Sequence, residues 1–223
     1  MEEQRAAQSS TEEKKGTPAP PLQPTKNTDY ATKEYWEKRY QRSPSELYDW
    51  FKTWEVLKPT LCDALGPSDD ILHLGCGNSS LSEDMYKEGY KKITNVDFSS
   101  VVIQQMKERY EATMPEMQWH VMDVLDMSYP DASFDVAIDK GTMDALMCEN
   151  SETWELDPKL AEQCHKMCSE VSRVLRSGGR YIQITFGQPH FRKRVLQRPE
   201  YGWTLEVKTI EAFHYFVYIM TKS

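Results

Sequence analysis

Short apolar runs alternate with longer amphipathic stretches over most of the chain. Five runs are typical of buried strands: Ile71–Leu74, Ile93–Val96, Trp119–Val121, Phe134–Ile138 and Arg180–Phe186. Between them, the apolar residues recur with helical spacing at 80–89, 99–112 and 158–176. Strands and helices in this order predict parallel pairing through right-handed crossovers. The chain is therefore expected to form an α/β fold with helices on both faces of a sheet.

The last part of the chain departs from this alternation. Two strand-like stretches, 203–209 and 213–221, are separated by too few residues for a crossover helix, so we expect an antiparallel hairpin. With the five earlier runs they predict a Rossmann-like, seven-stranded, mostly parallel sheet that ends in a C-terminal antiparallel hairpin. This combination is typical of one large group of transferases.

The N-terminal part divides into a tail and an aromatic segment. Residues 1–29 hold four of the twelve prolines, no aromatic residue and mixed charge, so we predict a disordered tail there and one domain over 30–223. The run from Thr32 to Gln41 has helical spacing and places Trp36 and Tyr40 one turn apart. Trp50 follows, and then a second helix from Trp54 to Leu61.

Composition narrows the class of protein. A length of 223 residues suits one domain, and 27 basic against 35 acidic residues give a net charge of −8, which argues against a duplex nucleic-acid binder. The sequence has no apolar run of about 18 residues and no secretory signal, so we expect no membrane span and a cytoplasmic protein. The odd number of cysteines, five, predicts reduced thiols, and the spacing of Cys164 and Cys168 suits core packing better than a metal site.

The strongest chemical signal is the sequence ILHLGCGNSSLS at 71–82. A strand runs into Gly75 and Gly77 and then directly into a helix, and glycines at such a turn allow a ligand to approach the backbone closely. Asp97 ends the next strand, twenty residues after Gly77, where an acid can bind the hydroxyl pair of a ribose. An ordinary tight turn and a capping acid explain each feature alone but not the combination.

The turn also indicates which cofactor is bound. Dinucleotide-binding turns carry a third small residue that packs helix against strand beneath a pyrophosphate. Ser80 stands at that position here. A site without pyrophosphate does not need the third glycine, so S-adenosylmethionine, which has an adenosine but no phosphate, fits better.

Two further pairs of residues follow strands at the same edge of the sheet. Asp123 and Val124 come after the third run, where the acid can accept from an adenine amino group while the valine covers the ring. Asp139 and Lys140 end the fourth strand, beside the point where strand order reverses, so we expect the reacting end of the cofactor there. Asp139 is a candidate for orienting the substrate, and the partner of Lys140 is either the cofactor carboxylate or Asp139.

Six stretches resemble a known family over residues 30–221: EYWEKRY, YDWF, LGCGNSSLSEDMY, VDFSSVVIQQM, FDVAIDKGTMDAL and EVSRVLRSGGRY. They are similar to the S-adenosylmethionine-dependent methyltransferases that modify lysines of translation elongation factor 1-alpha, the endothelin-converting-enzyme-associated methyltransferase family. The resemblance implies cofactor contacts at positions that match the family's motifs: Trp36, Tyr40, Trp50, Gly75, Asp97, Phe98, Asp123, Val124 and Lys140.

The expected function is therefore protein-lysine N-methylation, with elongation factor 1-alpha as the implied substrate. A small-molecule methyltransferase on the same fold and a cofactor-binding scaffold without catalysis remain alternatives. The chain has no large insertion between the fourth strand and the end, which favours an open cleft and a protein substrate. We expect a monomer that binds no nucleic acid directly, and the sequence indicates no catalytic base.

Two charged clusters follow the fourth and fifth expected strands. Acidic residues in one expected loop are candidates for attracting a basic protein: Asp144, Glu149, Glu152, Glu155 and Asp157. Basic residues after the fifth strand are expected to form a solvated loop, with the rim of the substrate site as the alternative: His190, Arg192, Lys193, Arg194 and Arg198.

Overall fold

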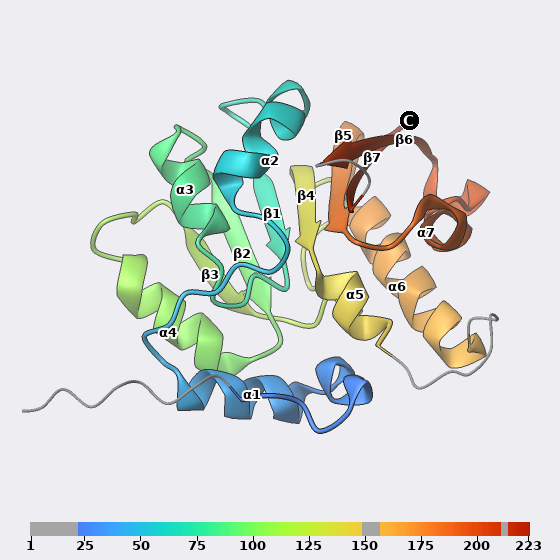
Figure 1. The fold of residues 1–223 in the computed structure, drawn as a ribbon. Helices are drawn as coiled ribbons and strands as arrows, with labels where there is room; N and C mark the ends of the chain where they lie inside the picture. Colours follow the sequence, from blue (N-terminus) through green and yellow to red (C-terminus); the bar gives the residue numbers. More distant parts are fainter. Residues whose placement is uncertain (1–21, 149–156, 211–213) are drawn as a thin grey trace, which may run out of the picture.

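A seven-stranded sheet forms the centre of the protein, whose computed structural model describes residues 22–148, 157–210 and 214–223. The strand order is β3-β2-β1-β4-β5-β7-β6 (Figure 1). The strands are β1 (Ile71–Leu74), β2 (Ile93–Asp97), β3 (Gln118–Val121), β4 (Phe134–Lys140), β5 (Leu175–Thr185), β6 (Trp203–Ile210) and β7 (Tyr215–Lys222). The first five are parallel, and β7 pairs antiparallel with both β5 and β6. The predicted fold class is confirmed.

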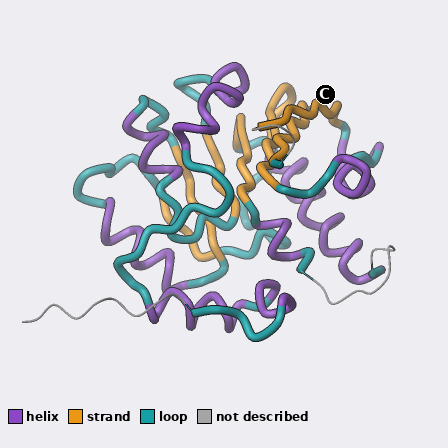
Figure 2. Tube along the Cα trace, in the orientation of Figure 1, coloured by secondary structure: helices purple, strands orange, loops and turns teal. Residues whose placement is uncertain are grey.

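Both faces of the sheet are apolar because the strand residues alternate between two cores. Ile71 and Ile138 belong to the core on one face, and their neighbours Leu72 and Ala137 belong to the core on the other. The first face is covered by α2 (Trp54–Leu61), α3 (Leu81–Lys87) and α4 (Ser100–Tyr110). The second is covered mainly by α6 (Pro158–Val174) and α7 (Pro189–Leu196). Figure 2 shows these helices on both sides of the strands.

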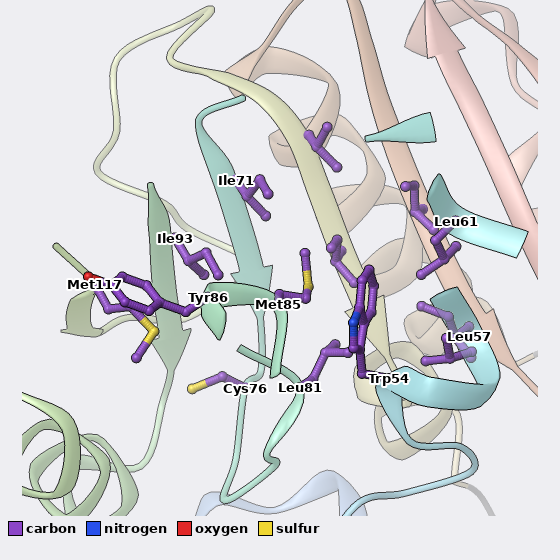
Figure 3. Packing of buried hydrophobic residues seen from close by; sticks show 14 of the residues in the cluster. Trp54, Leu57, Leu61, Ile71, Cys76, Leu81, Met85, Tyr86, Ile93 and Met117 are labelled. Atoms are coloured by element: carbon purple, nitrogen blue, oxygen red, sulfur yellow. The ribbon is translucent and has the colours of Figure 1, made fainter. Parts of the chain in front are cut away.

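The packing around β1 fixes the strand that leads into the glycine turn. Figure 3 shows Trp54, Leu57 and Leu61 of α2 in the same core as Ile71 of β1 and Met85 of α3. All five side chains are at least 96% buried. Burying an aliphatic side chain of this size contributes about 2 kcal/mol, so β1 is a rigid base for the residues that follow it.

Several helix predictions hold, and two helices are additional. The first predicted helix is α1 (Lys33–Arg42), and the other four predicted helices correspond to α2, α3, α4 and α6. The additional helices are α5 (Thr142–Leu146) and α7, which the sequence analysis left in connecting segments. The five residues of α5 are too few to give a clear apolar period, whereas Pro189 at the first position of α7 is a recognised start signal that was not used.

Residues 22–29 pack against α1. The carbonyl of Leu22 accepts hydrogen bonds from the Tyr35 hydroxyl at 3.0 Å and from Arg39 at 2.9 Å. Residues Asn27–Ala31 form a 3-10 helix that leads into α1. The rest of the predicted tail, residues 1–21, lies outside the described residues.

The five cysteines carry free thiols, and Cys164 and Cys168 lie on the buried face of α6. In the described part of the chain, no helix is both long and apolar enough to cross a membrane.

Candidate functional site

The glycine turn has the backbone geometry that its sequence suggests. Gly75 and Gly77 have φ values of +56° and +51°, a region that side chains rarely adopt. A Cβ at Gly75 would collide with the side chain of Thr142, and one at Gly77 would lie 2.9 Å from the Tyr40 hydroxyl. Glycine is therefore required at both positions for conformational and steric reasons.

Asp97 connects this turn to the end of β2. Its carboxylate accepts hydrogen bonds from the backbone N–H of Gly77 at 3.0 Å and of Ser99 at 2.9 Å. The side chain is buried, and this burial raises the pKa of Asp97 to about 6, while the two backbone donors oppose the shift. The pairing of the glycine turn with this acid, inferred from spacing, is a direct contact.

A cavity of about 600 Å³ lies at the carboxyl ends of the strands. Its lining includes all ten residues for which the sequence analysis predicts cofactor contacts: Trp36, Tyr40, Trp50, Gly75, Gly77, Asp97, Phe98, Asp123, Val124 and Lys140. These residues come from five separate parts of the chain, so only folding to this sheet order brings them together. Their contacts with the cofactor remain predictions.

The partner of Lys140 is neither of the two that the sequence analysis left open. Its ammonium group donates to Asp49 Oδ1 at 2.8 Å and to the carbonyl of Trp50 at 3.0 Å. Asp49 also accepts hydrogen bonds from the hydroxyls of Ser79 and Ser80. Burial alone would raise the pKa of Asp49, but Lys140 and the two hydroxyls lower it below its usual value.

Sequence reasoning missed Asp49, although it stands in the YDWF stretch directly before Trp50. The Lys140 side chain is only 2% exposed, and its burial lowers its pKa. A buried cation needs an acidic partner. The sequence offered one indication of it: Asp49 is the neighbour of Trp50, a residue expected to lie at the cavity.

Asp139 is placed away from the cavity. Its buried carboxylate accepts from the N–H of Thr142 at 2.7 Å, from the Tyr181 hydroxyl at 3.1 Å and from the Gln183 amide at 2.9 Å. These contacts cap the N-terminus of α5 and tie it to β5. The geometry does not support the expected role of Asp139 in orienting a substrate, because the side chain does not line the cavity.

The aromatic residues of the N-terminal segment form one cluster that lines the cavity. Trp36 stacks on Tyr40 with ring centroids 5.7 Å apart and meets Trp50 edge-on at 6.2 Å. A further member, missed in the sequence, is Arg39: its guanidinium lies 5.5 Å from the Trp50 ring and 5.3 Å from the Tyr48 ring. One face of this cluster therefore already holds a cation.

The two charged clusters differ from their expected arrangement. Asp144 lies on α5, is buried, and accepts from Arg192 at 2.6 Å, so it is not a surface acid of a loop. Arg192 lies on α7 and is 4% exposed, so the expectation of a solvated loop is wrong for this residue. Asp157 caps the N-terminus of α6. Glu149, Glu152 and Glu155 lie outside the described residues.

The residues present fit S-adenosylmethionine. The turn lines the cavity with backbone that carries no side chain at Gly75 or Gly77, and it lacks the third glycine associated with a pyrophosphate. Asp97 keeps lone pairs on both oxygens beyond the two backbone donors, which suits two ribose hydroxyls. Asp123 and Val124 provide an acceptor and an apolar wall further along the same cavity.

Comparisons with known proteins agree with this chemistry. A family model described as a methyltransferase domain matches residues 65–215. The chain is 39% identical to the mouse (Mus musculus) protein named EEF1A lysine methyltransferase 4, over 92% of this chain and 81% of that protein. It is 38% identical to the human (Homo sapiens) eEF1A lysine and N-terminal methyltransferase over 85% of this chain, which corresponds to 26% of that longer protein.

Solved structures show the same fold at low sequence identity. Magnesium protoporphyrin IX methyltransferase from Synechocystis, solved with bound S-adenosylmethionine, has a TM-score of 0.54 at 15% identity and aligns with 76% of this chain and 77% of that chain. A methyltransferase from Methanosarcina mazei has a TM-score of 0.57 at 17% identity, over 78% and 99% of the two chains. The chain therefore belongs to the S-adenosylmethionine-dependent methyltransferases, in the family that includes EEF1A lysine methyltransferase 4.

Proposed function

We propose that this enzyme transfers the methyl group of S-adenosylmethionine to a lysine ε-amine of elongation factor 1-alpha. The observation that carries the proposal is the similarity to relatives named for this activity, which spans 92% of the chain and so includes the whole cavity lining. A net charge of −8 also suits a basic protein partner.

Bound S-adenosylmethionine supplies an electrophilic methyl group on a sulfonium. Asp97 holds the ribose hydroxyls, and Asp123 with Val124 holds the adenine. Trp36, Tyr40 and Trp50 close the cavity over the cofactor. These residues supply alignment, which is the main requirement of a one-step displacement.

The substrate amine must be neutral when it reacts. A lysine has an unperturbed pKa of about 10.4, and its removal from water beside a sulfonium lowers that value. The ammonium group gives one proton to solvent on entering the site. The amine lone pair then forms the new N–C bond while the C–S bonding pair returns to sulfur, so the positive charge passes from sulfur to nitrogen.

Transfer of a labelled methyl group in a eukaryotic cell lysate tests this proposal without assuming the substrate. The expected result is one labelled protein of the size of elongation factor 1-alpha, in which mass spectrometry locates the label on lysine. Asp97→Ala protein is the matched control and should give no label.

The other outcomes separate the alternatives. Label in small metabolites would contradict a protein substrate and support a small-molecule methyltransferase. Label absent from every fraction, with cofactor binding measured in the same preparation, would support the scaffold alternative.

We also propose that the enzyme acts in the cytoplasm as a monomer. The free thiols of its five cysteines suit a reducing compartment. Sedimentation of the purified protein tests the monomer.

A further inference from the structure

A strained turn centred on Phe51 is not explained by cofactor binding. Phe51 has a φ of +66°, which is rare for a bulky residue. The N–H of Lys52 donates to the carbonyl of Trp50 at 2.9 Å, so residues 50–52 form a γ-turn of the positive-φ type, a strained conformation. Such strain persists only where surrounding contacts hold it, and it is concentrated at functional sites.

The buried lysine of β4 holds this turn. Lys140 donates both to the Trp50 carbonyl, which also closes the turn, and to the carboxylate of Asp49. Two consecutive residues immediately before Phe51 are thereby anchored to the end of β4. Burying a charged lysine is costly, and here the buried ammonium group positions the turn, so Lys140 is a positioning residue.

The turn directs the Phe51 ring toward the edge of the cavity. A Cβ at Gly141 would lie 3.1 Å from this ring, so the absence of a side chain there makes room for it. The ring meets Phe186 edge-on, with centroids 5.6 Å apart. Phe186 is 57% exposed and also lines the cavity, so the two rings stand where the cavity opens to solvent.

Asp144, which lines the same cavity, has an unsatisfied carboxylate oxygen. Oδ1 of Asp144 accepts from Arg192 at 2.6 Å and from the hydroxyl of Thr185 at 2.5 Å, and Thr185 directly precedes Phe186 in the chain. Oδ2 of Asp144 is buried and has no hydrogen-bond partner among the described residues. Asp144 also lines the cavity, and an unpaired buried acceptor of this kind suits an N–H donor supplied by a ligand.

We propose that Phe51 and Phe186 form one wall of the passage by which the side chain of a substrate lysine reaches the reacting centre, with its nitrogen directed toward Asp144. Because the two rings are in contact, the aliphatic stem of a lysine would pack along them rather than between them, and the rings attract its cationic end. A passage of this shape takes a long, unbranched, terminally cationic side chain. The inference rests on the proposed lysine methylation and specifies which residues admit the substrate.

Steady-state kinetics of Phe186→Ala test the passage. The kcat/KM for elongation factor 1-alpha should fall at least tenfold while the Kd for S-adenosylmethionine stays within twofold of wild type. Phe186→Tyr should restore most of the activity, because the ring is retained. The matched control is Phe191→Ala, which removes another partly exposed phenylalanine that does not line the cavity and should leave kcat/KM unchanged.

Two variants of Phe51 separate function from folding. Phe51→Gly removes the ring and relieves the positive φ, so it should unfold at a higher temperature than Phe51→Ala, which keeps the strain. Both should lose at least tenfold in kcat/KM. Lower activity without loss of stability in the glycine variant would identify the ring itself as the functional group.

The passage is overturned if Phe186→Ala retains wild-type kcat/KM, or if its cofactor affinity falls in parallel with its activity. The second result would assign Phe186 to the cofactor site. If the wild-type enzyme labels no lysine at all, the proposed function fails instead. The kinetics of the wild type and of Phe186→Ala therefore distinguish the two failures.

Discussion

Asp97→Ala should abolish detectable binding of S-adenosylmethionine while the domain remains folded. The substitution removes the acceptor for two ribose hydroxyls and also frees the N–H of Gly77, which the carboxylate holds in place. Hydrogen bonds to a charged group contribute about 1.5–3 kcal/mol each, so losing two weakens binding by roughly 100-fold or more. Isothermal titration calorimetry measures the affinity, and thermal unfolding checks the fold. An affinity close to that of wild type would show that the ribose lies elsewhere.

The same residue predicts how binding depends on pH. Because burial raises the pKa of Asp97 to about 6, the carboxylate is ionised above this pH and accepts hydrogen bonds through both oxygens. Below it, protonation removes one acceptor, so cofactor affinity should fall as the pH is lowered from about 7.5 to 5, by at most about tenfold per unit. Asp97→Asn, which cannot titrate, should bind weakly with little pH dependence. Equal pH dependence in this variant would assign the titration to another group.

Gly75→Ala should damage both stability and cofactor binding. The alanine would adopt a φ of +56°, which costs about 1 kcal/mol, and its Cβ would displace Thr142, so the total loss of stability should be about 3 kcal/mol. Because the turn would move relative to Asp97, the affinity for S-adenosylmethionine should fall at least about tenfold, which is about 1.4 kcal/mol. Chemical denaturation and calorimetry measure the two effects.

Gly202→Ala is a closely matched control. Gly202 has a similar φ of +63°, but a Cβ there meets no atom within 4 Å. It should show only the backbone cost of about 1 kcal/mol and unchanged cofactor affinity. If the two variants lose equal stability, the collision with Thr142 is not a significant constraint on the turn.

The sequence was most informative where function depends on local order along the chain. The strand, glycine turn and helix at 71–87 and the acid that ends β2 form a continuous pattern, so their geometry follows from spacing and residue type. The apolar runs of the parallel strands are similarly clear because both of their faces are buried. These features predict that Gly75, Gly77 and Asp97 lie at one cavity, whereas the positions of Trp50 and Phe98 there were implied only by the family resemblance.

Contacts between distant segments were not predictable in the same way. Asp49 and Lys140 are ninety-one residues apart, and no periodicity relates them. The same is true of Asp144 and Arg192, which sequence reasoning assigned to two separate exposed clusters although they form a buried ion pair. Ion pairs between distant segments depend on how helices and loops pack over the sheet. A run of like charges in the sequence is therefore not sufficient to predict a charged surface.

The conformation of Phe51 is a third example. A phenylalanine is a poor candidate for positive φ, so its residue type gives no indication of this turn. The strained turn exists because Lys140 and Gly141, from the end of β4, hold and accommodate it. The preference of phenylalanine for negative φ is therefore overridden at the edge of the cavity. Exceptions of this kind are expected at functional sites.

A crystal structure with bound S-adenosylhomocysteine tests the site most directly. We expect the ribose hydroxyls to donate to Asp97, the adenine to lie beside Val124 with its amino group on Asp123, and the sulfur to face the part of the cavity that Phe51 and Phe186 line. An adenosine bound elsewhere in the protein, or a ribose without contact to Asp97, would contradict this account of the cavity.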